Sequence, residues 1–282
     1  MTSPDQRPYH ERIEDAAFRR AVDLIDKGDV EALRAHLLQH PALIHQRMTF
    51  EPGYFANPTL LEFVAENPIR HERLPPNIVD VARTVLDAGA RADTRGLNAT
   101  LALVAAGRVP RECGVQGPLI DLLCDYGADA NGAMRSAIAH GEWIAVNALI
   151  RRGATVDLAA AAAMGRTDMV RTALPAANSE IRHFALAWAA QFGHTDVVRL
   201  LLDAGEDPSR YNPAGAHAHS TPLHQAAFAG HLDVVRLLVD RGARRDIRDT
   251  VYDGTPLQWA EYVRRADVVE FLRGAGSDTR GR

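Results

Sequence analysis

The chain has 282 residues, of which 46% are hydrophobic and 24% charged, a composition typical of a folded protein with a substantial core. Its 32 basic and 36 acidic residues give a formal net charge of -4, which argues against nucleic-acid binding through a broadly basic surface. The two cysteines, Cys113 and Cys124, do not make a disulfide framework, and neither a signal peptide nor a membrane-spanning apolar stretch is visible. We therefore expect a cytoplasmic protein without membrane contact.

The N-terminal half is expected to consist of helical hairpins of irregular length. Residues 13–45 are interpreted as an N-terminal capping hairpin, and residues 57–177 as a series of degenerate repeats. An insertion at residues 71–77 separates the two helices of one of these repeats. Almost no chain connects the hairpins after Gly127 and Gly153, so the connections in the middle of the chain are expected to be short or absent.

The C-terminal half contains three 22-residue segments that align without a gap, at residues 184–205, 221–242 and 255–276. Each is interpreted as a helix, a tight turn and a second helix that ends in glycine. Thr221-Pro222 and Thr255-Pro256 place a capping hydroxyl before a proline at the first helical position, where the missing N–H costs nothing. Residues 184–243 are thus expected to be regular repeats and residues 255–282 a C-terminal capping repeat, which bury their apolar faces by stacking.

The string TPLHQAAFAGHLDVVRLLVDRGA, which begins at Thr221, resembles the ankyrin repeat. The resemblance is strong from Phe184 to the end of the chain and moderate over residues 57–174, and the whole chain resembles bacterial ankyrin-repeat proteins. It implies a single all-α solenoid over residues 1–282, with about eight helix–turn–helix repeats and short or absent β-hairpin fingers in the middle. It also implies a concave groove that binds a protein or peptide partner.

One face of the first helices is expected to line this groove, because residues at i, i+3 and i+4 lie together on a helix. Aromatic residues are concentrated on this face and resemble a binding hot spot. The alternative is that these rings only cover neighbouring fingers as part of the core. The predicted groove residues are Trp188, Gln191, Phe192, Tyr211, Gln225, Phe228, Trp259 and Tyr262.

A long finger at residues 206–220 lies beside this aromatic face in the predicted arrangement. Its candidate contact residues are Arg210, Asn212, His217 and His219. The family resemblance gives His224 a framework role, a hydrogen bond between adjacent fingers. Three nearby histidines could in principle meet a zinc ion, but zinc requires four defined ligands, so we expect no metal and no cofactor.

No catalytic motif is present, and no catalytic residue is assigned. Cys113 is the sole candidate nucleophile, and a structural thiol is the favoured interpretation. The preferred hypothesis is a non-enzymatic adaptor that binds a protein or peptide partner, with nucleic acid disfavoured. The alternative is a small-molecule enzyme or ligand-binding protein whose site is built from the loops at residues 51–57, 108–116 and 210–219.

Overall fold

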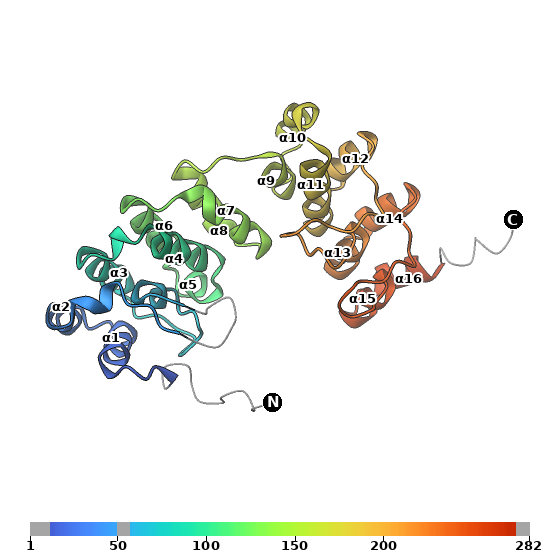
Figure 1. Cartoon of the computed structure of the whole chain (residues 1–282). Coiled ribbons are helices and arrows are strands. Elements are labelled where there is room, and N and C mark those ends of the chain that lie inside the picture. Colours follow the sequence, from blue (N-terminus) through green and yellow to red (C-terminus); the bar gives the residue numbers. More distant parts are fainter. Residues whose placement is uncertain (1–11, 50–56, 275–282) are drawn as a thin grey trace, which may run out of the picture. The chain divides into compact units, whose positions relative to one another are not determined.

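The computed structural model describes residues 12–49 and 57–274 and divides the chain into two compact units, 1–155 and 156–282 (Figure 1). Within the described ranges the secondary structure is helical, apart from one isolated β-bridge between Arg47 and Thr59. This confirms the predicted all-helical fold of stacked hairpins. The continuity of one solenoid over the whole chain stays a prediction.

The N-terminal unit pairs its helices into four hairpins over the residues that are described. The pairs are α1 (Ala16–Lys27) with α2 (Val30–Gln39), η3 (Leu60–Ala65) with α3 (Ile78–Asp87), α4 (Thr94–Ala106) with α6 (Gln116–Asp125), and α7 (Ala130–Ala139) with α8 (Trp143–Arg151). Three short elements connect them, η2 (Pro41–Ile44), η4 (Ala90–Ala92) and α5 (Arg108–Glu112). Only two residues separate Tyr126-Gly127 from the start of α7, as the sequence predicted.

A buried arginine fixes the insertion that separates η3 from α3. The side chain of Arg70 is fully buried, and its Nη2 lies 2.6 Å from Asp26 Oδ1 in α1 and 3.1 Å from Glu66 Oε2. The same nitrogen donates a hydrogen bond to the carbonyl oxygen of Phe63, at 2.8 Å. Because a buried charge needs partners of this kind, the insertion is tied both to its own repeat and to the first hairpin.

The expected loop at residues 108–116 is partly helical, which corrects the prediction. It contains α5, and Gln116 already begins α6. The buried Gln116 amide donates to the carbonyl oxygen of Val104 at 3.2 Å, and Arg111 Nε pairs with Glu142 at 3.0 Å. These contacts hold the segment against its neighbours. Residues 51–56 of the other predicted N-terminal loop lie outside the described residues.

Over its described residues, which end at 274, the C-terminal unit repeats the hairpin four times. The pairs are α9 (Leu158–Ala163) with α10 (Thr167–Ala173), α11 (Ser179–Gln191) with α12 (Thr195–Asp203), α13 (Pro222–Ala229) with α14 (Leu232–Asp240), and α15 (Pro256–Tyr262) with α16 (Ala266–Gly274). Short η5 (Leu174–Ala176) leads almost directly into α11, whereas long fingers precede α13 and α15. Valines and leucines of the second helices and paired alanines of the first helices form one continuous core.

Local signals in the sequence set the ends of these helices. Thr255 Oγ1 accepts the N–H of Gln258 at 3.3 Å, and the Gln258 side chain accepts the N–H of Thr255 at 2.9 Å, so two otherwise unpaired donors are satisfied. Gly205 and Gly242 follow second helices with φ of 89° and 88°, the left-handed conformation that favours glycine. Gly276, the equivalent glycine of the last repeat, lies outside the described residues.

One hydrogen bond recurs between neighbouring hairpins. The residue directly before each of α12, α14 and α16 binds, through its side chain, a carbonyl oxygen near the end of the first helix of the preceding hairpin. His194 Nε2 lies 2.8 Å from Ala163 O, and His231 Nε2 lies 3.0 Å from Gln191 O. In the last repeat Arg265 takes the histidine position, and its Nε donates to the carbonyl oxygen of Phe228 at 3.1 Å.

His224 adds a second link between repeats, one that joins a helix cap to the next finger. Its Nδ1 accepts the N–H of Thr221 at 3.2 Å and lies 2.8 Å from Thr221 Oγ1, so Nε2 carries the proton and donates to Gly254 O at 3.0 Å. The ring is completely buried. The structure therefore agrees with the framework role that the family resemblance implied.

We predict that the C-terminal unit exchanges its amide hydrogens unevenly. In α10 only Val170 is buried, whereas α12 and α14 each bury four residues, so α10 has less packing to oppose local opening. Hydrogen–deuterium exchange followed by mass spectrometry should be slowest around Leu201, Leu223 and Leu238 and faster over residues 160–174. Uniform protection, or protection greatest in α9 and α10, would contradict this order.

Replacing His224 should lower the free energy of unfolding, and it should also make that free energy depend less strongly on pH. Burial lowers the pKa of His183, His224 and His231, so each stays neutral in the folded chain while the unfolded chain takes up protons near pH 6.5. The free energy of unfolding therefore falls as pH drops from about 7 through 6.5 toward the lowered folded-state values, by up to about 1.4 kcal/mol per pH unit for each histidine.

In His224→Ala, the loss of the buried hydrogen bonds should cost about 1–3 kcal/mol at pH 7. The urea midpoint, followed by circular dichroism, should then fall less between pH 7 and pH 5.5 than in the wild type. The exposed His140, which bonds only to Ser136 O one turn earlier, supplies the control variant His140→Ala. A His224→Ala variant with the wild-type midpoint, or with the wild-type pH dependence, would show that the link is not structural.

Candidate binding site

Two fingers of the C-terminal unit meet above its first helices. The backbone N–H of Thr250 donates to the carbonyl oxygen of His219 at 2.9 Å, and the Tyr211 hydroxyl donates to Arg248 O at 2.6 Å. Within the longer finger the N–H of Asn212 donates to Ser220 O at 2.8 Å. These bonds fix the position of each fingertip relative to the helices that begin directly after it.

Asp249 organises the second finger. Its carboxylate accepts the backbone N–H groups of Val251, Tyr252 and Gly254 at 2.7–2.9 Å, and the indole N–H of Trp259 at 2.9 Å. Burial alone would raise the pKa of this carboxyl, but these four hydrogen bonds favour the charged form and lower it to about 2. Asp249 is therefore ionised at any physiological pH, and it fixes the rotamer of Trp259.

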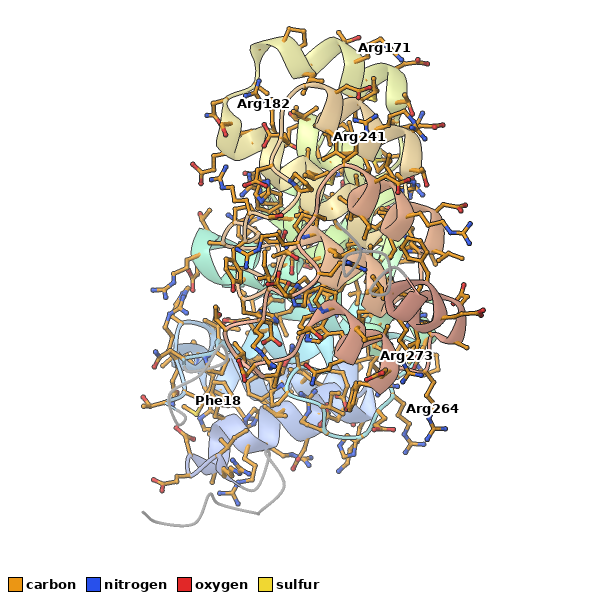
Figure 2. The ribbon with its side chains drawn as sticks, turned by 90° about the vertical axis from the view of Figure 1, so that its right-hand side faces the viewer. Phe18, Arg171, Arg182, Arg241, Arg264 and Arg273 are labelled. Carbon is orange, nitrogen blue, oxygen red and sulfur yellow. The ribbon has the colours of Figure 1, made fainter. Side chains whose placement is uncertain are left out.

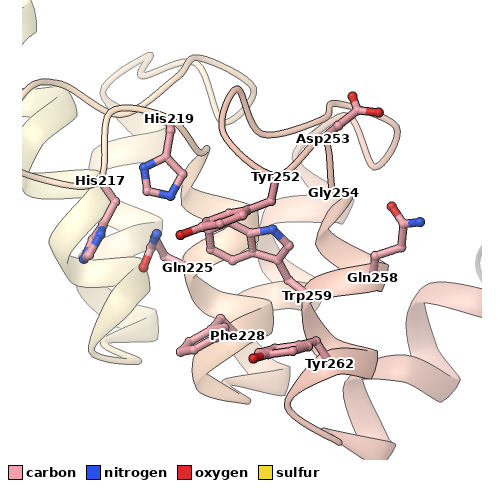
Figure 3. A pocket seen from close by; sticks show the side chains of 10 residues that line it. All are labelled: His217, His219, Gln225, Phe228, Tyr252, Asp253, Gly254, Gln258, Trp259 and Tyr262. Carbon is pink, nitrogen blue, oxygen red and sulfur yellow. The ribbon is translucent and has the colours of Figure 1, made fainter. Parts of the chain in front are cut away.

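A pocket of about 680 Å³ lies between this finger and helices α13 and α15 (Figure 3). Its volume falls within the range of ligand-binding clefts. Its lining comes from both fingers and from both helices. The lining residues are His217, His219, Gln225, Phe228, Tyr252, Asp253, Gly254, Gln258, Trp259 and Tyr262.

The aromatic rings are the main feature of this pocket. The Trp259 ring lies 5.8 Å from that of Phe228, edge to face, and 5.7 Å from that of His219. Phe228, Tyr252 and Tyr262 keep 44%, 76% and 84% of their surface exposed. Figure 3 shows Phe228 and Tyr262 below Trp259 and Tyr252 in the view, around the same space. Exposed rings thus converge from different elements on one hollow.

The pocket also differs in charge from the surface around it. Arginines such as Arg171, Arg241 and Arg273 lie exposed on the outside of the C-terminal unit (Figure 2). The pocket lining, by contrast, contains no lysine or arginine. Of the two nearby carboxylates, that of Asp253 is paired with Arg248, whereas Asp249 takes its hydrogen bonds from N–H groups of its own finger and the indole.

The structure brings six of the predicted site residues together in this pocket. They are His217, His219, Gln225, Phe228, Trp259 and Tyr262. Gln191, Phe192, Arg210 and Tyr211 lie outside its lining, and their contact with a partner stays a prediction.

Three of the predicted contact residues are buried, and of these only Gln225, which is 6% exposed, lines the pocket. The prediction of Trp188 as a groove residue is wrong, because only 1% of its surface is accessible and its ring packs edge to face against Phe184 at 4.6 Å. Asn212 is 4% exposed and serves to close the finger through Ser220. For Trp188 the alternative interpretation, a ring that belongs to the core, is the correct one.

Four lining residues were not predicted, namely Tyr252, Asp253, Gly254 and Gln258. Three of them belong to the tip of the second finger and one to the exposed side of α15. They could have been predicted from the short segment between Asp249 and Thr255. In this segment an aspartate, whose side chain can accept the backbone N–H groups that follow it, precedes Gly254 by five residues. Such an Asx-type turn directs Tyr252 back over the helix that follows.

Other candidate sites gain little support from their surroundings. Cys113 is exposed at the end of α5, and its Sγ accepts the N–H of Leu74 at 3.4 Å. The segments 108–116 and 210–219 of the alternative hypothesis belong to different units. Among the described residues there is no group of three potential metal ligands, and none of the described helices is long and apolar enough to cross a membrane.

Comparison with known families agrees with the repeats seen in the structure. A model described as three copies of the ankyrin repeat matches residues 210–280, and a single-repeat model matches residues 182–213. No curated protein matches the chain. The two matched segments cover α11 to α16, the same helices that carry the recurring hydrogen bonds and the pocket. The C-terminal part of the chain, over residues 182–280, therefore consists of ankyrin repeats.

Proposed function

We propose that the chain is a non-enzymatic adaptor that holds a protein or peptide partner in the pocket between its last two fingers. Ankyrin repeats are generally protein-interaction modules, which is compatible with this role. The observation that carries the proposal is the convergence of exposed aromatic rings on one hollow. A cytoplasmic location stays a prediction from the sequence.

The exposure of these rings is what favours a partner. Burying an aromatic side chain of this size contributes roughly 1.5–3 kcal/mol, so leaving Phe228, Tyr252 and Tyr262 in water forgoes stabilisation that a bound partner could supply. Single exposed apolar residues are common, but a cluster around a concavity is typical of an interaction site. Aromatic anchors in such pockets provide most of the affinity of many interfaces.

The rigidity of the pocket supports the same conclusion. Asp249 holds the Trp259 indole, His224 joins α13 to Gly254, and Arg265 holds the carbonyl group of Phe228. A site whose walls are fixed before binding loses little entropy on binding. The absence of lysine and arginine from the lining does not favour a nucleic-acid phosphate as the occupant.

Selection from a random peptide library displayed on phage, with the intact chain as bait, tests the proposal. Peptides selected by the wild type should bind Phe228→Ala and Tyr262→Ala at least about tenfold more weakly, as expected for hot-spot residues. Far-ultraviolet circular dichroism should be unchanged, since both rings are exposed. Met169→Ala in α10 is the matched control, because Met169 is 42% exposed in the same unit but lies outside the pocket.

Binding that survives both pocket substitutions would place the peptide elsewhere and contradict the proposal. A library that yields no binder at all would contradict it as well, and would favour the alternative of a small-molecule site.

A further inference from the structure

We infer that the pocket receives an arginine side chain of the partner polypeptide, whose guanidinium stacks among Phe228, Tyr252, Trp259 and Tyr262. The inference rests on the proposed function and adds the chemistry of the group that is bound. Three independent features of the pocket support it: its ring faces, the charge behind Trp259, and the polar groups left for the ligand.

The ring faces are the first feature. An aromatic face carries partial negative charge and attracts a cation placed within about 6 Å of its centre. Here four rings border one space, and three of them, Phe228, Tyr252 and Tyr262, are exposed. The chain itself forms this contact elsewhere, since the guanidinium of Arg236 lies 5.7 Å from the centre of the Phe271 ring. Arginine is the cation that most often forms such stacks in proteins.

The charge behind Trp259 is the second feature. Asp249 is ionised and in direct contact with the indole N–H, at 2.9 Å. In the described part of the chain it forms no ion pair, whereas the charge of the neighbouring Asp253 is balanced by Arg248. A carboxylate that accepts the indole N–H increases electron density on the ring. The Trp259 face toward the pocket is therefore a better acceptor for a cation than an isolated indole is.

The polar groups on the wall are the third feature. Gln225 donates its amide Nε2 to Ser220 Oγ at 2.8 Å, and its side-chain carbonyl oxygen is a hydrogen-bond acceptor in the pocket lining. Figure 3 shows this oxygen on the Phe228 side of the residue. The lining itself contains no lysine or arginine, and Arg248, which pairs with Asp253, lies outside it. The five N–H donors of arginine match such acceptors, and its planar group fits between rings.

A pair of nearly isosteric ligands tests the inference directly. N-acetyl-arginine methylamide and its citrulline counterpart differ in that citrulline replaces the charged guanidinium with a neutral urea. Binding to the intact, 15N-labelled chain is followed by the indole N–H signals of Trp143, Trp188 and Trp259, and the Trp259 signal is identified by its loss in Trp259→Phe. The arginine ligand should move the Trp259 signal and bind at least about fivefold more tightly than citrulline.

Two substitutions test which side chains cause the preference for arginine over citrulline. Tyr262→Leu keeps an apolar wall but removes a ring face, so it should weaken arginine binding and bring the two ligands closer to equal affinity. Asp249→Asn should reduce the preference for arginine while citrulline binding persists. Met169→Ala should behave as the wild type. If citrulline binds as tightly as arginine, or if arginine leaves the Trp259 signal unmoved, the inference is overturned.

The outcome is separable from that of the proposed function. Peptides that depend on Phe228 and Tyr262 but bind through a neutral or acidic side chain would support the adaptor function and refute the arginine assignment. A preference for arginine over citrulline, with no peptide binding through the pocket, would refute the adaptor function while leaving the cation preference of the pocket intact.

Discussion

The C-terminal unit depends on one recurring hydrogen bond, from the start of α12, α14 and α16 to the end of the first helix of the preceding hairpin. A carbonyl oxygen at a helix end lacks an intrahelical partner and carries partial negative charge, so a donor from the next repeat both satisfies it and sets the spacing of the hairpins. The acceptors are Ala163, Gln191 and Phe228. The same spacing requires a glycine at position 193, because a Cβ there would lie 2.7 Å from Nδ1 of the His231 ring.

The pocket is a consequence of that spacing. Phe228 supplies the last of these acceptors, so the bond from Arg265 also fixes the backbone from which its ring projects. His224 also holds neighbouring repeats together, because its hydrogen bond to the carbonyl oxygen of Gly254 joins α13 to the next finger. Asp249 then turns the fingertip back onto Trp259. The pocket walls are therefore extensions of the contacts that hold neighbouring repeats together, which explains why a site with exposed rings can still be well ordered.

The parts of the fold that the sequence predicts best are those that depend on local signals. Capping residues at Thr221 and Thr255 and a glycine at the end of each segment bound three stretches of equal length, 22 residues, so the hairpins of the C-terminal half could be predicted. The burial of Trp188 could not be predicted, because helical position does not reveal that the Phe184 ring packs against it and that the indole is 1% exposed. In the N-terminal half, the ion pair of Arg70 with Asp26 joins residues 44 positions apart, a contact that no local pattern indicates.

The central claim is that the partner binds against the rings between the last two fingers. A crystal structure of the chain with a peptide selected from the library tests it most directly. We expect the peptide to lie in the pocket, in contact with Phe228, Trp259 and Tyr262, and the fingertips to keep the positions they have in the free chain. A peptide bound to another surface, with the pocket left open to solvent, would contradict the account.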